Sequence, residues 1–239
     1  MNERPRGRAV ETADAARERR TGHRLLWPVY ASVYDLIWDS PLTHQLAKAA
    51  VDACPGDGLV VDLGCGTGLI AREFVHRGRE VVGVDNAPAM LRRAQRTGRV
   101  TSSVLASSDS TPIKSGSASA VLLCNVLHLH ANPAAALSEA VRIARPGAFI
   151  LITWPTDTVT NDQLTRLDLA TGRGFTRSFT ADQLRRMVAL TASLLRVRRG
   201  SDADLLDAVA SAVDQHPLVL VANATPSNVQ RMLVLHARA

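Results

Sequence analysis

The stretch that decides the fold of this chain reads Val60-Val61-Asp62-Leu63-Gly64-Cys65-Gly66-Thr67-Gly68. A short apolar run ends at an acidic residue and passes into a loop with three glycines at alternate positions. Because glycine lacks a Cβ atom, such a loop can turn sharply and lets a ligand approach its backbone closely. The pattern predicts a buried strand with a ligand-binding loop at its carboxyl end.

Strand and helix patterns alternate on both sides of this loop. Before it, Ser40-Pro41 predicts the start of a helix, a capping serine followed by proline, and Cys54-Pro55-Gly56 predicts its end. After it, a helix is expected over Leu69–Arg77 and a second strand over Glu80–Val84, which leads into Asp85. These elements form one βαβ unit.

The same alternation continues to about residue 153. The further predicted elements are a helix from Asn86 and Pro88 to Gly98, a strand over Ser102–Ala106, a strand over Ala120–Cys124, a helix from Asn132-Pro133 to Arg145-Pro146-Gly147, and a strand over Ala148–Thr153. Continuous apolar strands between helices indicate a parallel sheet that is covered on both faces.

The C-terminal part follows a different pattern. A capping box at Thr180-x-x-Gln183 predicts a helix through about Leu190, whereas residues 194–216 give no clear pattern. Leu218–Ala222 and Met232–His236, separated by a turn-rich segment, predict an antiparallel hairpin. We therefore expect one α/β domain, built on a doubly wound, seven-stranded, mostly parallel sheet with this hairpin at its C-terminal end.

Size and composition fit a single domain inside the cell. A length of 239 residues suits one α/β domain with additions. The three cysteines, Cys54, Cys65 and Cys124, have no paired or clustered spacing, so neither a disulfide framework nor a metal site is indicated. No apolar run approaches the roughly 18 residues of a membrane span, and no signal-peptide pattern is present. We expect a cytoplasmic protein without a membrane span.

The positive charge of the chain is concentrated near its N-terminus. The formal net charge is +6, and residues 1–24 supply half of it, with seven arginines against four acidic residues. We interpret residues 1–24 as a flexible arginine-rich leader and residues 25–239 as the folded domain; an arm that contacts nucleic acid or a partner is the alternative. Elsewhere arginines are scattered among acidic residues, which argues against a nucleic-acid substrate.

The spacing of the loop glycines separates two kinds of nucleotide site. A dinucleotide fingerprint that begins at Gly64 and Gly66 would need a glycine at position 69, which is Leu69. Glycines at 64, 66 and 68 after Asp62 instead resemble the first motif with which class I methyltransferases bind S-adenosylmethionine (SAM). The resemblance covers about residues 55–155 and departs from the family at Ser119-Ala120, where many relatives carry an aromatic residue followed by aspartate.

The resemblance implies roles for particular residues, with SAM as cofactor and S-adenosylhomocysteine as product. Asp62 would hold the amino acid part of SAM, and Asp85 would accept hydrogen bonds from both ribose hydroxyls. Asn86, Ser108 and Asp109 would lie against the adenine. The full set of expected cofactor-binding residues is Tyr34, Asp62, Gly64, Cys65, Gly66, Gly68, Asp85, Asn86, Ser108, Asp109 and Asn125.

Aromatic residues outside the central βαβ unit indicate where an acceptor would bind. In the family resembled, segments like those at about 25–54 and 154–180 fold over the sheet edge as lids, and Tyr34-Asp35 resembles a pair found near the start of ubiquinone and menaquinone methyltransferases. The expected acceptor-lining residues are Trp27, Tyr30, Trp38, Trp154, Phe175 and Phe179. A largely apolar acceptor would fit such a pocket. The alternative is a small core that holds the lids in place.

Two histidines follow the fourth predicted strand, at the sheet edge where a methyl group would point. An imidazole titrates near neutral pH, so His128 and His130 are candidate general bases for an acceptor that must lose a proton. A structural role for either histidine is the alternative. Methyl transfer is an in-line displacement, in which positioning of the acceptor and exclusion of water supply most of the catalysis.

The interpretation favoured by these patterns is methyl transfer to a small molecule at O, N or C. Of the 28 lysine and arginine residues, 26 are arginine, which indicates a GC-rich genome and is consistent with a natural-product acceptor in secondary metabolism. An RNA or protein methyltransferase, with the leader as a contact arm, is one alternative. A SAM-binding protein without methyl transfer is another. A homodimer is compatible with all three.

Overall fold

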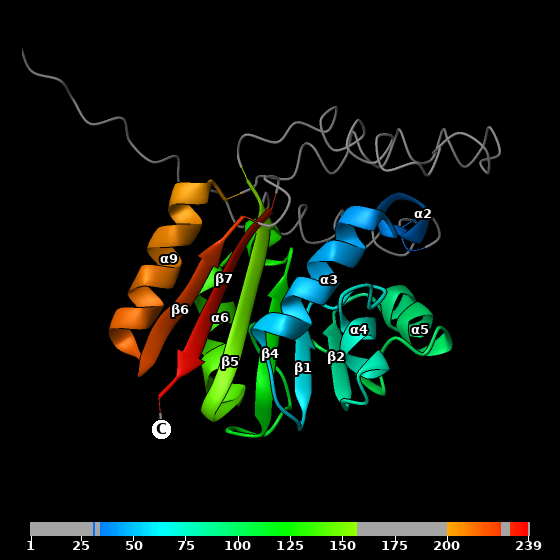
Figure 1. The fold of residues 1–239 in the computed structure, drawn as a ribbon, viewed down its shortest axis with the longest axis horizontal. Coiled ribbons are helices and arrows are strands. Elements are labelled where there is room, and N and C mark those ends of the chain that lie inside the picture. The colour runs from blue at the N-terminus through cyan, green and yellow to red at the C-terminus, as the bar shows by residue number, and fades with distance from the viewer. Residues whose placement is uncertain (1–30, 32–33, 157–199, 226–229, 239) are drawn as a thin grey trace, which may run out of the picture.

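The chain is built around one seven-stranded sheet. The computed structural model describes residues 31, 34–156, 200–225 and 230–238. The strands lie in the order β3-β2-β1-β4-β5-β7-β6 (Figure 1). Their bounds are β1 Val60–Leu63, β2 Val81–Asp85, β3 Ser102–Leu105, β4 Ala118–Cys124, β5 Ala144–Pro155, β6 Leu218–Ala224 and β7 Gln230–Ala237.

Parallel pairing joins the first five strands. β1 pairs in parallel with β2 and β4, β2 with β3, and β4 with β5. β7 lies antiparallel to both β5 and β6. The predicted fold, a mostly parallel sheet with an antiparallel C-terminal hairpin, is therefore confirmed. Because five strands run the same way, the loops that follow β1 to β4 all emerge at one edge of the sheet.

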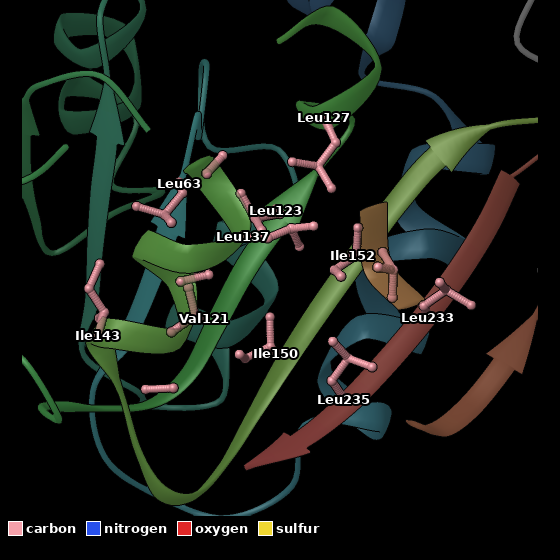
Figure 2. Close-up of a cluster of buried hydrophobic side chains, with 14 of the residues drawn as sticks. Leu63, Val121, Leu123, Leu127, Leu137, Ile143, Ile150, Ile152, Leu233 and Leu235 are labelled. Carbon is pink, nitrogen blue, oxygen red and sulfur yellow. The ribbon is translucent and has the colours of Figure 1, made fainter. Parts of the chain in front are cut away.

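Helices cover both faces of this sheet. Their bounds are α2 Tyr34–Trp38, α3 Pro41–Ala53, α4 Ala71–His76, α5 Pro88–Arg96, the short 3₁₀ helix η1 Leu127–Leu129, α6 Pro133–Ile143 and α9 Asp202–Gln215. Residues of α3, α4 and α5 share one apolar cluster with the sheet. Residues of α6 and α9 share the other, part of which Figure 2 shows around Leu137, Val121 and Ile150.

Successive side chains of β1 point to opposite faces of the sheet, so they pack against different layers of helices. Val61 and Leu63 belong to the cluster under α6, whereas Val60 belongs to the cluster under α3 and α4. Asp62 is two residues from Val60, so it points to the same face as Val60. The acidic residue at the end of β1 therefore lies under the helices α3 and α4 at the loop edge of the sheet.

Several helix and strand boundaries differ from those the sequence predicts. The helix expected from Leu69 begins at Ala71, because turns occupy the residues directly after the glycine loop. The helix expected to end at the Arg145-Pro146-Gly147 turn ends at Ile143, and β5 begins at Ala144, where it pairs with Ala118 before the register shifts. Long-range pairing of this kind leaves no local signal in the sequence.

In the C-terminal part, β6 and β7 confirm the predicted antiparallel hairpin. A helix also lies in the segment 194–216, for which the sequence shows no clear pattern. Residues 194–216 contain α9, which starts with a capping box in which Ser201 and Asp204 bond each other's backbone N–H groups. The helix predicted between Thr180 and Leu190, the leader 1–24 and most of the lid segment 154–180 lie outside the described residues. Within the described part of the chain, no helix has the length and apolarity to cross a membrane.

A buried arginine contacts Ser119, one of the two residues at which the sequence departs from the pattern of the family it resembles. Arg79 is 7% exposed, and its guanidinium donates to the Cys54 carbonyl at 2.8 Å and to Ser119 Oγ at 2.8 Å. The guanidinium also lies 5.4 Å from the centroid of the Phe74 ring. Neutral oxygens thus satisfy a cation at the end of the sheet opposite the glycine loop.

We expect Arg79→Gln to lower the free energy of unfolding by about 2–4 kcal/mol, because a shorter side chain leaves buried oxygens without donors. Urea denaturation at pH 7 measures this change. The exposed Arg96 serves as the control, since its recorded side-chain contact is a carbonyl in its own helix, and Arg96→Gln should change stability by less than about 0.5 kcal/mol. Equal losses for the two variants would contradict a structural role for Arg79.

Candidate functional site

The structure brings most of the described candidate residues to one edge of the sheet. The glycine loop follows β1, Asp85 ends β2, Ser108 and Asp109 follow β3, and Asn125 and His128 follow β4. These strands are neighbours in the sheet, in the order β3-β2-β1-β4. Residues that lie up to 66 positions apart in the chain, Asp62 and His128, therefore line one continuous rim.

The glycine loop needs its glycines for two different reasons. Gly64, Gly66 and Gly68 have φ values of 74°, 55° and 77°, a left-handed backbone that disfavours other residues. A Cβ on Gly64 would lie 2.5 Å from the Val126 side chain, and one on Gly68 would lie 2.8 Å from Arg99 Cβ. A Cβ on Gly66 would meet only the Tyr34 ring, at 3.8 Å, so the space beside Gly66 is bounded by Tyr34 and filled by no other described residue.

The carboxylate of Asp62 is buried under this loop. Asp62 is 2% exposed, and among the described residues its Oδ1 atom has no hydrogen-bond partner. Burial, followed by the negative charge of Asp85, raises the pKa of Asp62 to about 7. A cationic or hydroxyl donor bound at this position would satisfy the oxygen and favour the ionised form.

Asp85 connects the second strand to the glycine loop. Its Oδ2 accepts a hydrogen bond from the Gly66 N–H at 2.9 Å, and its Oδ1 accepts one from the Ala87 N–H at 2.8 Å. Burial raises the pKa of Asp85, and backbone N–H donors partly oppose this shift. Each carboxylate oxygen has two acceptor positions, so both can still accept a ligand hydroxyl.

Asn125 has a strained backbone at the end of β4. Its φ of 57° makes it the one non-glycine residue with positive φ in the described chain. The Asn125 N–H donates to the Thr153 carbonyl at 2.9 Å, while its buried side-chain oxygen has no partner among described residues. Strain of this kind, together with an unsatisfied polar atom, is typical of ligand-binding positions.

His130 and Asp109, which sequence reasoning assigned to different roles, contact each other. His130 Nε2 lies 3.7 Å from Asp109 Oδ2, and His130 Nδ1 accepts a hydrogen bond from the Asn132 N–H at 3.0 Å. The Nδ1 atom is thereby occupied as a hydrogen-bond acceptor. The basic nitrogen of His130 is therefore already engaged by the protein.

His128 lies in η1 and is 6% exposed. Its carbonyl accepts a hydrogen bond from the Gly200 N–H at 3.1 Å, which joins the turn after β4 to the segment that leads into α9. Leu127 beside it is fully buried in the core (Figure 2). The position of His128 is thus fixed by packing on one side and by a backbone hydrogen bond on the other.

The short helix α2 covers the glycine loop, and residues that sequence reasoning did not select hold it there. Asp35 accepts hydrogen bonds from the Thr67 hydroxyl at 2.6 Å, from Arg93 Nε at 2.5 Å and from Arg99 Nη1 at 2.8 Å. The partners lie 32, 58 and 64 positions away along the chain. No local pattern marks such contacts, and only the resemblance of Tyr34-Asp35 drew attention to this segment.

Two of the six expected acceptor-lining aromatic residues, Trp38 and Trp154, lie in the described part of the chain, and they have different surroundings. Trp38 is half-buried in α2, with its ring centroid 6.5 Å from that of Tyr34. Trp154 is 1% exposed in the core, where its indole N–H donates to Asp202 at 2.7 Å. Trp154 therefore belongs to the main core between the sheet and the helices α6 and α9. Trp27, Tyr30, Phe175 and Phe179 lie outside the described residues.

Comparison with known proteins gives one family over this region. Residues 61–152 match the family described as methyltransferase domain. An uncharacterized methyltransferase of Mycobacterium tuberculosis H37Rv is 36% identical over 97 residues, which cover 41% of this chain and 40% of that protein. Human methyltransferase-like protein 27 is 32% identical over 126 residues, covering 48% of this chain and 51% of that protein. The chain thus spans about half the length of these relatives or less.

Solved structures share the fold over most of the chain. A complex between the Haloferax volcanii Trm112 methyltransferase activator and a methyltransferase matches with a TM-score of 0.61 and 16% identity, covering 90% of this chain and 97% of that one. Geranyl diphosphate C-methyltransferase of Streptomyces coelicolor, solved with S-adenosylhomocysteine, matches with a TM-score of 0.56 and 15% identity, covering 80% and 75%. At these identities the likeness concerns the fold alone.

The raised pKa of Asp62 predicts a pH-dependent stability in the absence of ligand. An acid whose pKa rises on folding costs stability, and the cost grows from the unfolded pKa of about 4 up to the folded value of about 7. We expect Asp62→Asn to be stabilised relative to the parent protein, with a gap that widens by about 2–3 kcal/mol between pH 5 and pH 8. Urea denaturation at both pH values tests this, and a constant gap would contradict it.

Proposed function

We propose that this chain, whose residues 61–152 form a methyltransferase domain of the class I, Rossmann-like fold, binds SAM at the rim described above and transfers its methyl group to a small, largely apolar molecule at O, N or C. The family match and the fold support methyl transfer as the reaction class. The acceptor class is inferred from this chain's own residues.

The buried Asp62 carboxylate is the observation that carries the proposal. It lies beneath a loop without side chains at Gly64, Gly66 and Gly68, and its Oδ1 atom lacks a partner among the described residues. The methionine part of SAM carries an ammonium group, which would donate to that oxygen and stabilise its charge. The burial of a second carboxylate nearby, Asp85, also favours a ligand that carries positive charge.

The remaining cofactor-binding residues would fit the adenosine. Asp85 keeps acceptor positions for the ribose hydroxyls while its backbone hydrogen bonds hold it against Gly66. Asn86 is exposed beside it, and Ser108 and Asp109 follow the neighbouring strand β3, where an adenine would extend. Cys65 would contribute its backbone, since burial raises the pKa of its thiol well above the usual range.

The chemistry divides between the cofactor and the protein. SAM supplies an electrophilic methyl group on a sulfonium, and displacement at that carbon needs an acceptor in line with the carbon–sulfur bond. Tyr34 borders the space beside Gly66, so α2 would exclude water from the methionine part of the site. Asn125 would place its side-chain oxygen at the same rim.

His128 is the proposed general base for an acceptor that loses a proton. It follows β4 at the loop edge and is held by the packing of η1. His130 is the weaker candidate, because its Nδ1 already accepts a hydrogen bond from the Asn132 N–H. We therefore assign His130 to shaping the rim beside Asp109, and an acceptor without a labile proton would need neither histidine.

The acceptor class rests on the aromatic residues near the rim. Trp38 and Tyr34 on α2 present a tilted aromatic pair beside the glycine loop. Aromatic faces favour planar or apolar molecules. One solved structure that shares the fold is a geranyl diphosphate C-methyltransferase, an enzyme that acts on a small molecule. For this chain we propose only the class of the acceptor, a small and largely apolar molecule, and no particular compound.

The direct test measures binding and turnover separately. Calorimetry should detect binding of SAM and S-adenosylhomocysteine to the full chain, and Asp85→Ala should weaken SAM binding at least tenfold, about 1.4 kcal/mol, through loss of the ribose acceptors. A panel of small apolar acceptors should release S-adenosylhomocysteine. Absence of any binding would overturn the site, whereas binding without release on the panel would contradict the proposed acceptor class.

A matched pair of glycine variants separates ligand contact from backbone strain. Gly66 and Gly98 have similar φ values of 55° and 65°, but only a Cβ on Gly66 would enter the space beside Tyr34, whereas a Cβ on Gly98 meets nothing within 4 Å. We expect both alanine variants to lose about 1 kcal/mol of stability. Only Gly66→Ala should weaken SAM binding, by at least tenfold in calorimetry. Equal affinities in the two variants would argue against the cofactor lying at Gly66.

A further inference from the structure

A network of charged side chains joins α2 to the glycine loop. Asp35, which is 9% exposed, accepts from the Thr67 hydroxyl, from Arg93 and from Arg99. Thr67 is fully buried between two of the loop glycines. A buried carboxylate with three polar partners fixes its neighbours strongly, because any partner that is lost leaves a charge in a poorly solvated place.

Arg99 contacts more members of this network than Arg93 and Arg72 do. Its Nη1 atom donates to Asp35 Oδ2 at 2.8 Å and also lies 3.3 Å from the Thr67 carbonyl, and its Nη2 lies 3.5 Å from Asp39 Oδ2. The side chain of Arg93 contacts Asp35 and that of Arg72 contacts Asp39, and Arg72 reaches the loop through its backbone N–H, which donates to the Gly68 carbonyl at 3.0 Å. Among the described arginines, Arg99 is thus the one whose guanidinium bonds both the α2 residue Asp35 and the backbone of the glycine loop.

Packing at Gly68 adds a second link between Arg99 and the loop. A Cβ on Gly68 would lie 2.8 Å from Arg99 Cβ, so the backbone of the two residues is in close contact. Arg99 lies between the helix α5 and the strand β3, and its backbone N–H donates to the Ala94 carbonyl of α5 at 3.0 Å. The loop is therefore held from outside by a residue that is itself anchored in the fold.

We propose that Arg99 is a positioning residue that couples the docking of α2 to the conformation of the cofactor loop. This inference rests on the proposed SAM site and goes beyond it, because neither the glycine motif nor the family match assigns a role to Arg99. The guanidinium fixes the Thr67 peptide and the Asp35 carboxylate at the same time. Cofactor binding then depends on α2 being docked, and Tyr34 closes over Gly66 only when this link is intact.

The geometry explains why a guanidinium is needed. A planar group with several N–H donors can reach Asp35, Asp39 and Thr67 together, which a single ammonium at the end of a lysine cannot do. Arg99→Lys should therefore retain the contact with Asp35 and lose the contact with the loop carbonyl. Its SAM affinity should fall between that of the parent protein and that of Arg99→Met.

The first experiment compares SAM affinities of purified variants by calorimetry. We expect Arg99→Met to weaken binding at least tenfold, and Arg93→Met, which removes a neighbouring charge from the same carboxylate, to weaken it less than about threefold. Asp35→Asn should weaken binding as Arg99→Met does, and the double variant should be no weaker than either single variant. Multiplicative losses, or equal losses for Arg93→Met and Arg99→Met, would overturn the coupling.

A stability control excludes a merely structural effect. Arg79→Gln removes another buried arginine at the opposite end of the sheet, and it should lower stability while leaving SAM affinity within about twofold of the parent value. If Arg99→Met lowers the melting temperature but binds SAM with unchanged affinity, Arg99 is structural and the proposal is wrong.

A measurement without ligand keeps this inference separate from the proposed function. Amide hydrogen exchange should accelerate in Gly64–Leu69 and in Tyr34–Trp38 together in Arg99→Met, and in neither segment in Arg79→Gln. If the parent protein binds no SAM, the proposed function fails while this result still decides the coupling. Acceleration in only one of the two segments would overturn it.

Discussion

β1 pairs in parallel with β2 on one side and with β4 on the other, and the rest of the site depends on this pairing. The register aligns Asp62 with Gly83 and with Leu122, so the end of β1 is enclosed by two strands. A carboxylate at the end of a central strand is then shielded from water on both sides. The loop that follows must satisfy this carboxylate or leave it to a ligand, and among the described residues the Oδ1 atom of Asp62 has no hydrogen-bond partner.

Burial and charge at the rim act together. Asp62 and Asp85 both lie in poorly solvated positions, and the charge of Asp85 adds to the cost of ionising Asp62. Such a pair stores electrostatic energy that a ligand with cationic groups can release. The backbone N–H of Gly66 already offsets part of this energy at Asp85. The protein thus trades stability without ligand for affinity, a trade-off that is common at binding sites.

The neighbouring networks keep this rim in shape. Arg99 and Asp35 hold the glycine loop beneath α2, while Glu139 holds the loop after β3 by accepting from the Thr111 N–H and hydroxyl and from Arg142. The bonds from Arg142, with those from Thr111, lower the pKa of Glu139 to about 2, although burial opposes the shift. Both loops are therefore fixed by charged hydrogen bonds from side chains that lie outside the loops themselves.

The amino-acid sequence by itself determined the fold class, the glycine loop after β1 and the carboxylates Asp62 and Asp85 near the strand ends, because strand and helix periodicity, glycine spacing and the residues that end strands are local properties of the chain. The tertiary structure alone decided that Asp35, Thr67 and Arg99 meet, that His130 contacts Asp109, and that Trp154 lies in the core. These contacts join residues from separate elements. Which side chains meet depends on strand order and packing, and no pattern within a short stretch of sequence encodes either of them.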